Sequence, residues 1–338
     1  MRIGIFAPGQ DQEARTVQRA ISRLDGAFCH CHLFDLSQGP GKARLDAGGL
    51  RLNGQDLTLL DLAYVRGFSH AVPLAPDPGP DLEWTVWQAD YPAKVQLQGF
   101  WMSLFSELSR WGVTVVNPPE VHVRAFPRPL FLAGLAARGV DVPPMLVTNR
   151  EEHARRFLDR ACGKAAFRPA TGRAAWQALS GPWMRELFHP GRPPVWLAET
   201  RPGPHLRAWL YQGRPLAVIG HHAPVPGPTE RLETVFEVRD PGLSEAFARI
   251  HEASGAPLVL AHLVREGDRA WVYDLDPDPL SHWLPRAFRS RLVQALALSL
   301  VGRPVPEQPL LPPALRPFLP ASRMLADLFA FERIKHGD

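Results

Sequence analysis

The order of predicted elements at the N-terminal end is the feature that most constrains the fold. An apolar segment at 2–6 is broken at Pro8-Gly9, and apolar residues then recur at helical spacing through 11–24. A second apolar segment follows at 28–34. Two parallel strands need a crossover connection, which is usually a helix, so this strand–helix–strand order is typical of a parallel sheet. We therefore expect an α/β domain at this end of the chain.

The same pattern extends this domain to residue 117. A buried strand is expected at 57–65, a long helix at 82–111 and a fourth strand at 113–116. Pro118-Pro119 ends that strand, so we place the domain boundary at 117. Four tryptophans of the helical region are most simply explained as core or interface residues. Alternatively, they line a groove for a peptide substrate or form a homodimer contact. They are Trp84, Trp87, Trp101 and Trp111.

The rest of the chain carries further helices and two hairpins. Helices are expected at 129–138, where Gly139 ends the helix, at 151–160 and at 286–300. Strands are expected at 165–168, 195–199, 205–211, 215–219, 258–264 and 270–274.

These elements divide the remainder into two units. Residues 118–302 form a second domain, with subdomains at 118–195 and 196–302. Residues 303–338 are rich in proline and are expected to form a tail along the surface.

Composition excludes several classes of protein. Hydrophobic residues make up 45% of the 338 residues and charged residues 21%, which is typical of a globular chain and not of a disordered one. No run of 18 apolar residues occurs, so we expect no membrane-spanning helix. The first residues carry no signal-peptide pattern, and three cysteines are too few for a disulfide framework. We therefore expect a cytoplasmic protein.

The charge balance is basic but dispersed. Lys and Arg number 38 and Asp and Glu 34, which gives a formal net charge of +4, and no block of like charges occurs. The charge admits a nucleic-acid partner, but no basic stripe supports that interpretation. Binding of anionic small ligands accounts for the charge equally well.

The segment at 272–279, VYDLDPDP, carries two acidic residues two positions apart on a predicted strand, Asp274 and Asp276. Side chains alternate between the faces of a strand, so both carboxylates point to the same face. Two like charges on one face repel each other unless a cation lies between them, and Mg²⁺ prefers carboxylate oxygens together with substrate phosphates. The alternative is a solvent-facing pair at the end of a strand.

Pairing across this hairpin adds His262 to the two acids. With a turn centred on Gly267, His262 is expected opposite Val272. It then lies on the same face as Asp274, in a diagonal relation to it. The hairpin thus suggests a metal site made of Asp274, Asp276 and His262.

Four stretches, in this order along the chain, resemble segments of the ATP-grasp family. They are VTVVNPPEVHVRAFPRPLFLAGLAARGVDVPPMLVTN at 113–149, AAFRP at 165–169, VWLAETRPGPHLRAWLYQGRPLAVI at 195–219 and PLVLAHLVREGDRAWVYDLDPDP at 257–279. The ordered set is most similar to the RimK-like ligases, including the microviridin-type (graspetide) peptide ligases. The resemblance implies an N-terminal parallel-sheet domain, the pre-ATP-grasp domain, followed by a two-subdomain ATP-grasp fold.

The resemblance assigns nucleotide contacts to four residues. Arg128 and Arg168 stand where the family has its two nucleotide-binding lysines, and Glu199 stands at the hinge that meets the adenine or ribose. Arg207 matches the catalytic arginine that faces the γ-phosphate and the acyl-phosphate. A guanidinium group binds phosphate in a bidentate manner, but it is bulkier than an ammonium.

The resemblance also implies a metal set and a phosphate loop. Asp274 stands in place of a glutamate, Asp276 in place of an asparagine and His262 in place of an aspartate. Imidazole is a poor ligand for Mg²⁺ and a better one for Zn²⁺ or Mn²⁺. A loop at Thr171 and Gly172 could close over the phosphates, because glycine permits close backbone approach, and an ordinary turn is an equally good interpretation.

The activity that the resemblance implies is an ATP-dependent ligation. A carboxylate of a peptide or small-molecule substrate attacks ATP, forms an acyl-phosphate, and is then joined to an amine or a hydroxyl. ATP and Mg²⁺, with Mn²⁺ as the alternative metal, are the implied cofactors. The departures at the lysine and metal positions keep open a second interpretation, a catalytically degenerate ATP-grasp protein that binds a nucleotide or a partner.

Arg66, at the end of the third predicted strand, is a further candidate for binding a substrate carboxylate. Ligands of parallel α/β sheets bind at the carboxyl ends of the strands. Asp11, in the loop after the first strand, is a weaker candidate.

Overall fold

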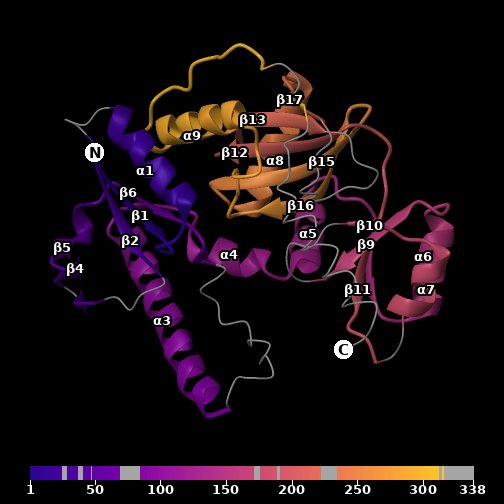
Figure 1. Ribbon diagram of the computed structural model, residues 1–338, viewed down its shortest axis with the longest axis horizontal. Coiled ribbons are helices and arrows are strands. Elements are labelled where there is room, and N and C mark those ends of the chain that lie inside the picture. The colour runs from indigo at the N-terminus through magenta and orange to yellow at the C-terminus, as the bar shows by residue number, and fades with distance from the viewer. Residues whose placement is uncertain are drawn as a thin grey trace.

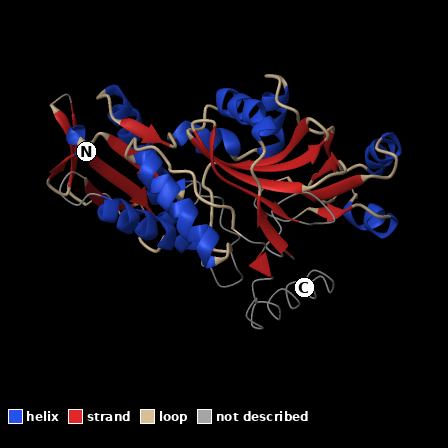
Figure 2. Cartoon of the chain, turned by 90° about the horizontal axis from the view of Figure 1, so that it is seen from above, coloured by secondary structure: helices blue, strands red, loops and turns tan. Residues whose placement is uncertain are grey.

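The computed structural model describes residues 1–24, 29–36, 41–46, 48–68, 84–170, 176–188, 191–221, 234–311 and 314–315. In this part of the chain the strands form one parallel and three antiparallel sheets, which confirms the mixed α/β class. The N-terminal sheet and the large antiparallel sheet occupy opposite halves of the molecule in Figure 2. Figure 1 places a small antiparallel sheet beyond the large one, at the end remote from the N-terminus.

The N-terminal sheet is parallel, as the strand–helix–strand order predicts. Its strands are β1 (Arg2–Ala7), β2 (His30–Asp35), β6 (Leu62–Val65) and β7 (Thr114–Val116), in the order β2-β1-β6-β7. Helices α1 (Gln12–Leu24) and α9 (Arg286–Leu300) lie side by side on one face, and α3 (Trp84–Arg110) packs on the other (Figure 1). Because α9 comes from the C-terminal half of the chain, the two halves share one core.

The local sequence explains why these helices form. Ala14, Val17 and Ile21 recur at helical spacing in α1 and are buried against the sheet. The Asp11 carboxylate caps α1 by accepting hydrogen bonds from the backbone N–H groups of Glu13 at 2.8 Å and Ala14 at 2.9 Å. The buried positions of α3 follow the same spacing and are Trp101, Leu104, Phe105 and Leu108.

The tryptophans of the α3 region divide between core and surface. Trp101 is buried beside Phe6, which confirms the core interpretation for this residue. Trp111 follows the helix and is 47% exposed. The side chains of Trp84 and Trp87 lie outside the described residues. A homodimer contact through this region stays a prediction.

The third predicted strand is shorter than expected. Its first residues form a 3₁₀ turn, η1 (Leu57–Leu59), and β6 begins only at Leu62. The Asp56 carboxylate accepts a hydrogen bond from the N–H of Thr58 at 3.1 Å, which holds these apolar residues in a turn. Three short strands that the pattern does not predict form a separate antiparallel sheet before it. They are β3 (Ala43–Asp46), β4 (Gly49–Leu52) and β5 (Gln55–Asp56).

The second part of the chain begins with two short helices, α4 (Pro119–Ala125) and α5 (Arg128–Ala136). A small antiparallel sheet follows in the order β10-β9-β11-β8, with α6 (Glu151–Arg160) and α7 (Gly181–Leu187) packed against it. Its strands are β8 (Met145–Thr148), β9 (Ala165–Pro169), β10 (Gln177–Ala178) and β11 (Val195–Glu199).

The large sheet is antiparallel and has the order β16-β15-β12-β13-β14-β17. One face packs on α5 and α8 (Ser244–Ser254), and part of the other face packs on α9. A 3₁₀ turn, η2 (Pro241–Leu243), precedes α8. The strands are β12 (His205–Tyr211), β13 (Arg214–His221), β14 (Thr234–Glu237), β15 (Leu258–Glu266), β16 (Arg269–Asp276) and β17 (Ala314–Leu315).

The register of the β15–β16 hairpin differs from the predicted one. Val272 lies opposite Leu263, and a bulge next to it sets His262 directly opposite Asp274. The predicted pairing is wrong first because the turn holds two residues, Gly267 and Asp268, so that Glu266 pairs with Arg269. The bulge between His262 and Leu263 then inserts one extra residue into β16. His262 and Asp274 still share one face, and direct opposition brings them closer together than a diagonal relation does.

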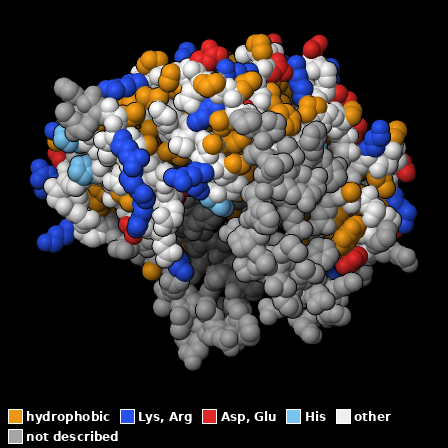
Figure 3. All heavy atoms as spheres, turned by 45° about the horizontal axis from the view of Figure 1, so that its top comes forward, with side chains coloured by type: hydrophobic (Ala, Val, Ile, Leu, Met, Phe, Trp, Pro, Cys, Tyr) orange, Lys and Arg blue, Asp and Glu red, His pale blue; other side chains and the backbone are white. Residues whose placement is uncertain are grey.

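Two expectations from composition concern the surface and the membrane. Over the described ranges, no helix combines the length and the apolar character needed to cross a bilayer. On the face drawn in Figure 3, the Lys and Arg side chains of the described residues are scattered and do not form one stripe. The domain limits at 117, 195 and 302 stay a prediction.

Candidate active site

Three residues of the large sheet stand in one row across neighbouring strands. Arg207 on β12 lies opposite His262 on β15, and His262 lies opposite Asp274 on β16. Directly opposed residues of antiparallel strands point to the same face, so the three side chains are neighbours. Asp276 lies two positions further along β16 and points the same way. All four residues are buried.

Two arginines from other elements reach this row. Arg128 opens α5 and donates from Nη1 to Oδ1 of Asp274 at 2.7 Å. The same nitrogen contacts the backbone carbonyl of Leu275, and Nη2 lies 3.6 Å from Oδ1 of Asp276. Arg168 on β9 donates from Nη1 to Oδ2 of Asp274 at 3.0 Å. Arg128 and Arg168 thus contact the predicted acidic pair, and Arg207 lies in the same row, next to His262.

Arg168 is held in an aromatic pocket. Its guanidinium carbon lies 4.9 Å from the ring centre of Trp176 and 4.3 Å from that of Trp196, its cross-strand neighbour on β11. Only 1% of Arg168 is exposed, and its Nε and Nη2 atoms have no hydrogen-bond partner among the described residues. A buried guanidinium with unused donors fits an anion such as phosphate.

Arg207 is fixed in a similar way by one ring. Its guanidinium carbon lies 4.3 Å from the ring centre of Trp283, which follows β16 in the chain. Trp283 in turn stacks on Trp209 of β12, with ring centres 5.7 Å apart. Because Trp283 rests on β12 through Trp209, this stack keeps the Arg207 guanidinium close to β12.

The charges of this cluster determine its protonation. Burial by itself raises the pKa of Asp274, but the charges of Arg128 and Arg168 outweigh it and hold that pKa well below its usual range. Burial lowers the pKa of His262 to about 3, and the charge of Arg207 acts in the same direction. The cluster at neutral pH therefore contains three guanidinium cations, two aspartates and a neutral imidazole.

Replacing His262 by glutamine is expected to flatten the pH dependence of stability. The unfolded chain binds the His262 proton below about pH 6.5, whereas the folded chain binds it only near pH 3, so stability falls as the pH drops through this window. Between pH 7 and pH 5 this residue alone should cost the wild type about 2 kcal/mol, measured by urea unfolding at each pH. The control His282→Gln, at a side chain 46% exposed, should keep the wild-type slope. Identical slopes in all three proteins would contradict the argument.

The remaining predicted site residues are Glu199, Thr171 and Gly172. Glu199 ends β11, where its carboxylate lies 3.2 Å from Nη2 of Arg201 and its backbone carbonyl accepts a hydrogen bond from the hydroxyl of Tyr273 at 2.7 Å. A contact of Glu199 with adenine or ribose stays a prediction. Thr171 and Gly172 lie outside the described residues.

A divalent cation does not fit this arrangement as it stands. Mg²⁺ would need free carboxylate oxygens, but both oxygens of Asp274 accept hydrogen bonds from guanidinium groups. The described part of the chain holds no group of three or more His, Cys, Asp or Glu side chains placed to share a metal ion. The metal assignment of Asp274, Asp276 and His262 stays a prediction, and we derive no chemical step through a metal.

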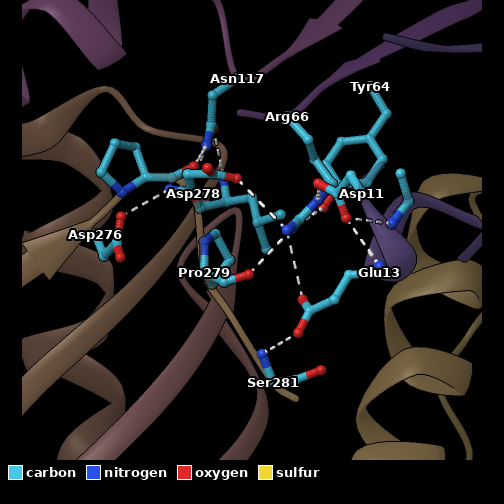
Figure 4. Close-up of polar contacts among 12 residues, drawn as sticks. Asp11, Glu13, Tyr64, Arg66, Asn117, Asp276, Asp278, Pro279 and Ser281 are labelled. Carbon is cyan, nitrogen blue, oxygen red and sulfur yellow. Dashed lines mark hydrogen bonds and ion pairs between the residues drawn. The ribbon is translucent and has the colours of Figure 1, made fainter. Parts of the chain in front are cut away.

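The loop after β16 anchors the acidic strand to the N-terminal domain (Figure 4). The Asn117 side chain donates to the backbone carbonyls of Leu258 and Pro277 at 2.6 Å each and accepts from the N–H of Leu258 at 2.8 Å. The N–H of Asp278 donates to Oδ1 of Asp276 at 3.0 Å, which closes the turn. Asp276 is therefore held from both sides, by this turn and by Arg128.

Arg66 joins the same loop to α1. Its Nη1 donates to the backbone carbonyl of Pro279 at 3.0 Å, and its Nε donates to Asp11 at 3.0 Å. Its Nη2 lies 3.5 Å from Glu13 and 3.7 Å from Asp278 (Figure 4). These carboxylates already balance the positive charge of Arg66, so its role is structural. In this arrangement Arg66 is not available to bind a substrate carboxylate.

Sequence reasoning missed the groups that hold the predicted arginines and acids. The sequence offered two signals: Trp196 lies in a predicted strand, and Asp278 lies between two prolines. Neither signal indicates which arginine or acid the residue will contact. Two cavities that described residues line, of about 640 and 460 Å³, lie beside α3 and beside α9. The missed residues are Trp176, Trp196, Trp283, Asn117 and Asp278.

Comparison with known proteins places the fold. No family model matches the chain, and no curated protein matches its sequence. Solved structures match over most of its length. The ATP-grasp ligase PsnB, complexed with precursor peptide PsnA2 and AMPPNP, covers 89% of this chain and 96% of its own, with a TM-score of 0.72 and 18% identity.

Two further structures agree with this likeness. The macrocyclase MdnC from Microcystis aeruginosa MRC, bound with precursor peptide MdnA, covers 89% of this chain and 100% of its own, with a TM-score of 0.67 and 15% identity. A RimK domain protein from Sphaerobacter thermophilus DSM 20745 covers 88% and 98%, with a TM-score of 0.53 and 16% identity. The chain therefore has the fold of the RimK-like ATP-grasp proteins, as its motifs predict.

Proposed function

We propose that this chain, which has the ATP-grasp fold, binds ATP at the cluster of Arg128, Arg168 and Arg207 and uses it to activate a substrate carboxylate. The observation that carries the proposal is the convergence of three guanidinium groups from α5, β9 and β12 on one buried face. Arg168 also keeps two buried donors, Nε and Nη2, without a partner among the described residues. The phosphates of a triphosphate supply acceptors for these donors and negative charge beside the guanidinium groups.

The proposed reaction has two steps. An oxygen of the substrate carboxylate attacks the γ-phosphorus, the bond to the β,γ-bridging oxygen breaks, and ADP leaves with that electron pair. An amine or hydroxyl then attacks the acyl carbon of the acyl-phosphate, phosphate leaves, and the nucleophile loses a proton to solvent. Phosphoryl transfer depends mainly on alignment and charge neutralisation, which fixed guanidinium groups can provide.

Each arginine has its own role in this scheme. Arg168, whose guanidinium lies over two indole rings, holds the phosphates nearest to the small sheet. Arg207, stacked on Trp283, faces the γ-phosphate and the acyl-phosphate. Arg128, held by Asp274 and Asp276 at the opposite end of the row, adds its positive charge to the triphosphate site. Glu199 is assigned to the adenine or ribose.

We infer a peptide as the substrate class. The structures of PsnB and MdnC each contain a bound precursor peptide. That likeness supports a carboxylate-bearing peptide as the substrate of this chain. The bond formed is an amide if the nucleophile is an amine and an ester if it is a hydroxyl.

A second candidate function is nucleotide or partner binding without turnover. It is favoured by one observation, that Asp274 is fully engaged by two arginines and so offers no open position. Calorimetry with AMPPNP and an assay for ADP release, with ATP and a pool of Asp- and Glu-rich peptides, separate the two. Nucleotide binding together with ADP release supports the ligase. Nucleotide binding without ADP release in the presence of any of the peptides supports the second candidate. If no nucleotide binds, both are rejected.

Replacing Arg207 by methionine is expected to lower ADP release by about 100-fold or more, because a charge aimed at the reacting phosphate is lost. Affinity for AMPPNP should fall much less, since Arg128 and Arg168 remain. ADP release at saturating ATP and calorimetry on the same preparations measure the two effects. Arg160→Met, at an exposed position of α6, is the matched control. If Arg207→Met released ADP as fast as the wild type, Arg207 would have no part in the reaction.

A further inference from the structure

The two carboxylates of the β16 end already share a cation that belongs to the protein. Asp274 and Asp276 lie on one face, two positions apart, and both are buried. Such a pair repels itself unless a positive charge lies close to both members. Arg128 supplies that charge, with Nη1 at 2.7 Å from Asp274 and Nη2 at 3.6 Å from Asp276.

The position of this guanidinium is tightly determined. Arg128 is only 8% exposed, and its Nη1 also contacts the backbone carbonyl of Leu275, the residue between the two acids. A guanidinium presents several donors in a fixed plane, so it can span two acceptors, which a single ammonium cannot do in the same way. It does not lose its proton in a protein.

The other oxygen of Asp274 is also occupied, by Nη1 of Arg168 at 3.0 Å. A metal ion at this pair would therefore have to displace two buried guanidinium groups. Beside the pair lies His262, directly opposite Asp274, and imidazole is a poor ligand for Mg²⁺. Each oxygen of Asp274 is already hydrogen-bonded to a guanidinium, so an incoming cation would enter against two buried positive charges.

We infer that Arg128 takes the place of a divalent cation at this site, so that the chain binds a nucleoside triphosphate without needing a metal ion. The inference rests on the proposed function, because it concerns how the same site neutralises a triphosphate. Arg128, Arg168 and Arg207 supply the positive charge, and the two aspartates serve to hold Arg128 rather than to coordinate an ion.

The test compares nucleotide affinity with and without divalent metal. Calorimetry with AMPPNP is done on the full chain in excess Mg²⁺, in excess Mn²⁺ and in excess EDTA. Dissociation constants that agree within about threefold, which is less than 1 kcal/mol, support the inference. Affinity at least tenfold weaker in EDTA overturns it and leaves the proposed nucleotide site intact. No binding under any of the three conditions overturns the proposed function together with the inference.

A second measurement needs no nucleotide. Titration of Mn²⁺ followed by electron paramagnetic resonance should detect no bound ion in the wild type. In Arg128→Met the two aspartates lose their shared cation, and they should then bind Mn²⁺, while AMPPNP binding becomes at least tenfold stronger with metal than in EDTA. Arg128→Gln, which retains a polar side chain, serves if the methionine variant fails to fold by circular dichroism. Arg160→Met should behave as the wild type. Bound Mn²⁺ in the wild type, or none in a folded Arg128 variant, contradicts the inference.

Discussion

Replacing Asp274 by alanine is expected to lower the free energy of unfolding by about 3–5 kcal/mol, because it leaves Arg128 and Arg168 buried without their shared carboxylate. The side chains of these two arginines are 10% and 1% exposed, so water cannot replace the lost partner at either one. Urea unfolding at pH 7 measures the change. Asp268→Asn, at a fully exposed turn position of the same hairpin, should change stability by less than about 0.5 kcal/mol.

The difference between Asp274→Ala and the wild type should also depend on pH in a defined direction. The charges around Asp274 hold its pKa below that of the unfolded chain, despite the opposing effect of burial. The stabilisation from this carboxylate is therefore complete above about pH 4 and is lost as the pH falls below it. Unfolding midpoints that converge at low pH would agree with this account. A difference below about 1 kcal/mol at pH 7 would show that the two arginines are not paired as described.

Replacing Arg66 by methionine is expected to destabilise the protein by about 3–5 kcal/mol, since three carboxylates then face one another without a cation. Arg66 is 3% exposed as a side chain, and its partners Asp11, Glu13 and Asp278 are 14%, 14% and 3% exposed. Urea unfolding provides the measurement. Arg19→Met, at an exposed position of α1, is the matched control and should have little effect.

The Arg66 variant carries a second expected result, which separates positioning from mere stability. Arg66 holds the carbonyl of Pro279 and lies near Asp278, whose N–H fixes Asp276. Loss of Arg66 should therefore weaken AMPPNP binding by about tenfold under conditions where the variant remains folded, whereas Arg66→Lys should restore part of it. An Arg66→Met protein that is less stable but binds AMPPNP as the wild type does would limit Arg66 to a structural role.

Much of the secondary structure was predictable because it depends on local periodicity. The helices at 151–160 and 286–300 and the strands at 195–199 and 205–211 coincide with α6, α9, β11 and β12. In each, the spacing of apolar residues reflects one face turned to a core. The strands β3, β4 and β5 were missed because each has at most four residues, too few for an alternating pattern to stand out.

The sequence could name charged residues that meet in the fold, but not the contacts between them. The resemblance singled out Arg128, Arg168, Arg207, Asp274 and His262, and the structure brings them to one buried cluster. Which of them touch depends on a bulge beside His262 and on where α5 meets the large sheet. A change of one residue in register moves a side chain to the other face, so residue spacing alone could not settle it.

Periodicity and motif order in this sequence determined a parallel N-terminal sheet, an acidic β-hairpin and a set of arginines suited to phosphate. Only the tertiary structure decided that Arg128 lies between Asp274 and Asp276, and that Arg66 reaches a carbonyl 213 residues away. The physical reason is that local spacing specifies which face a side chain takes. Its partner is set by the packing of segments that meet only in the folded chain.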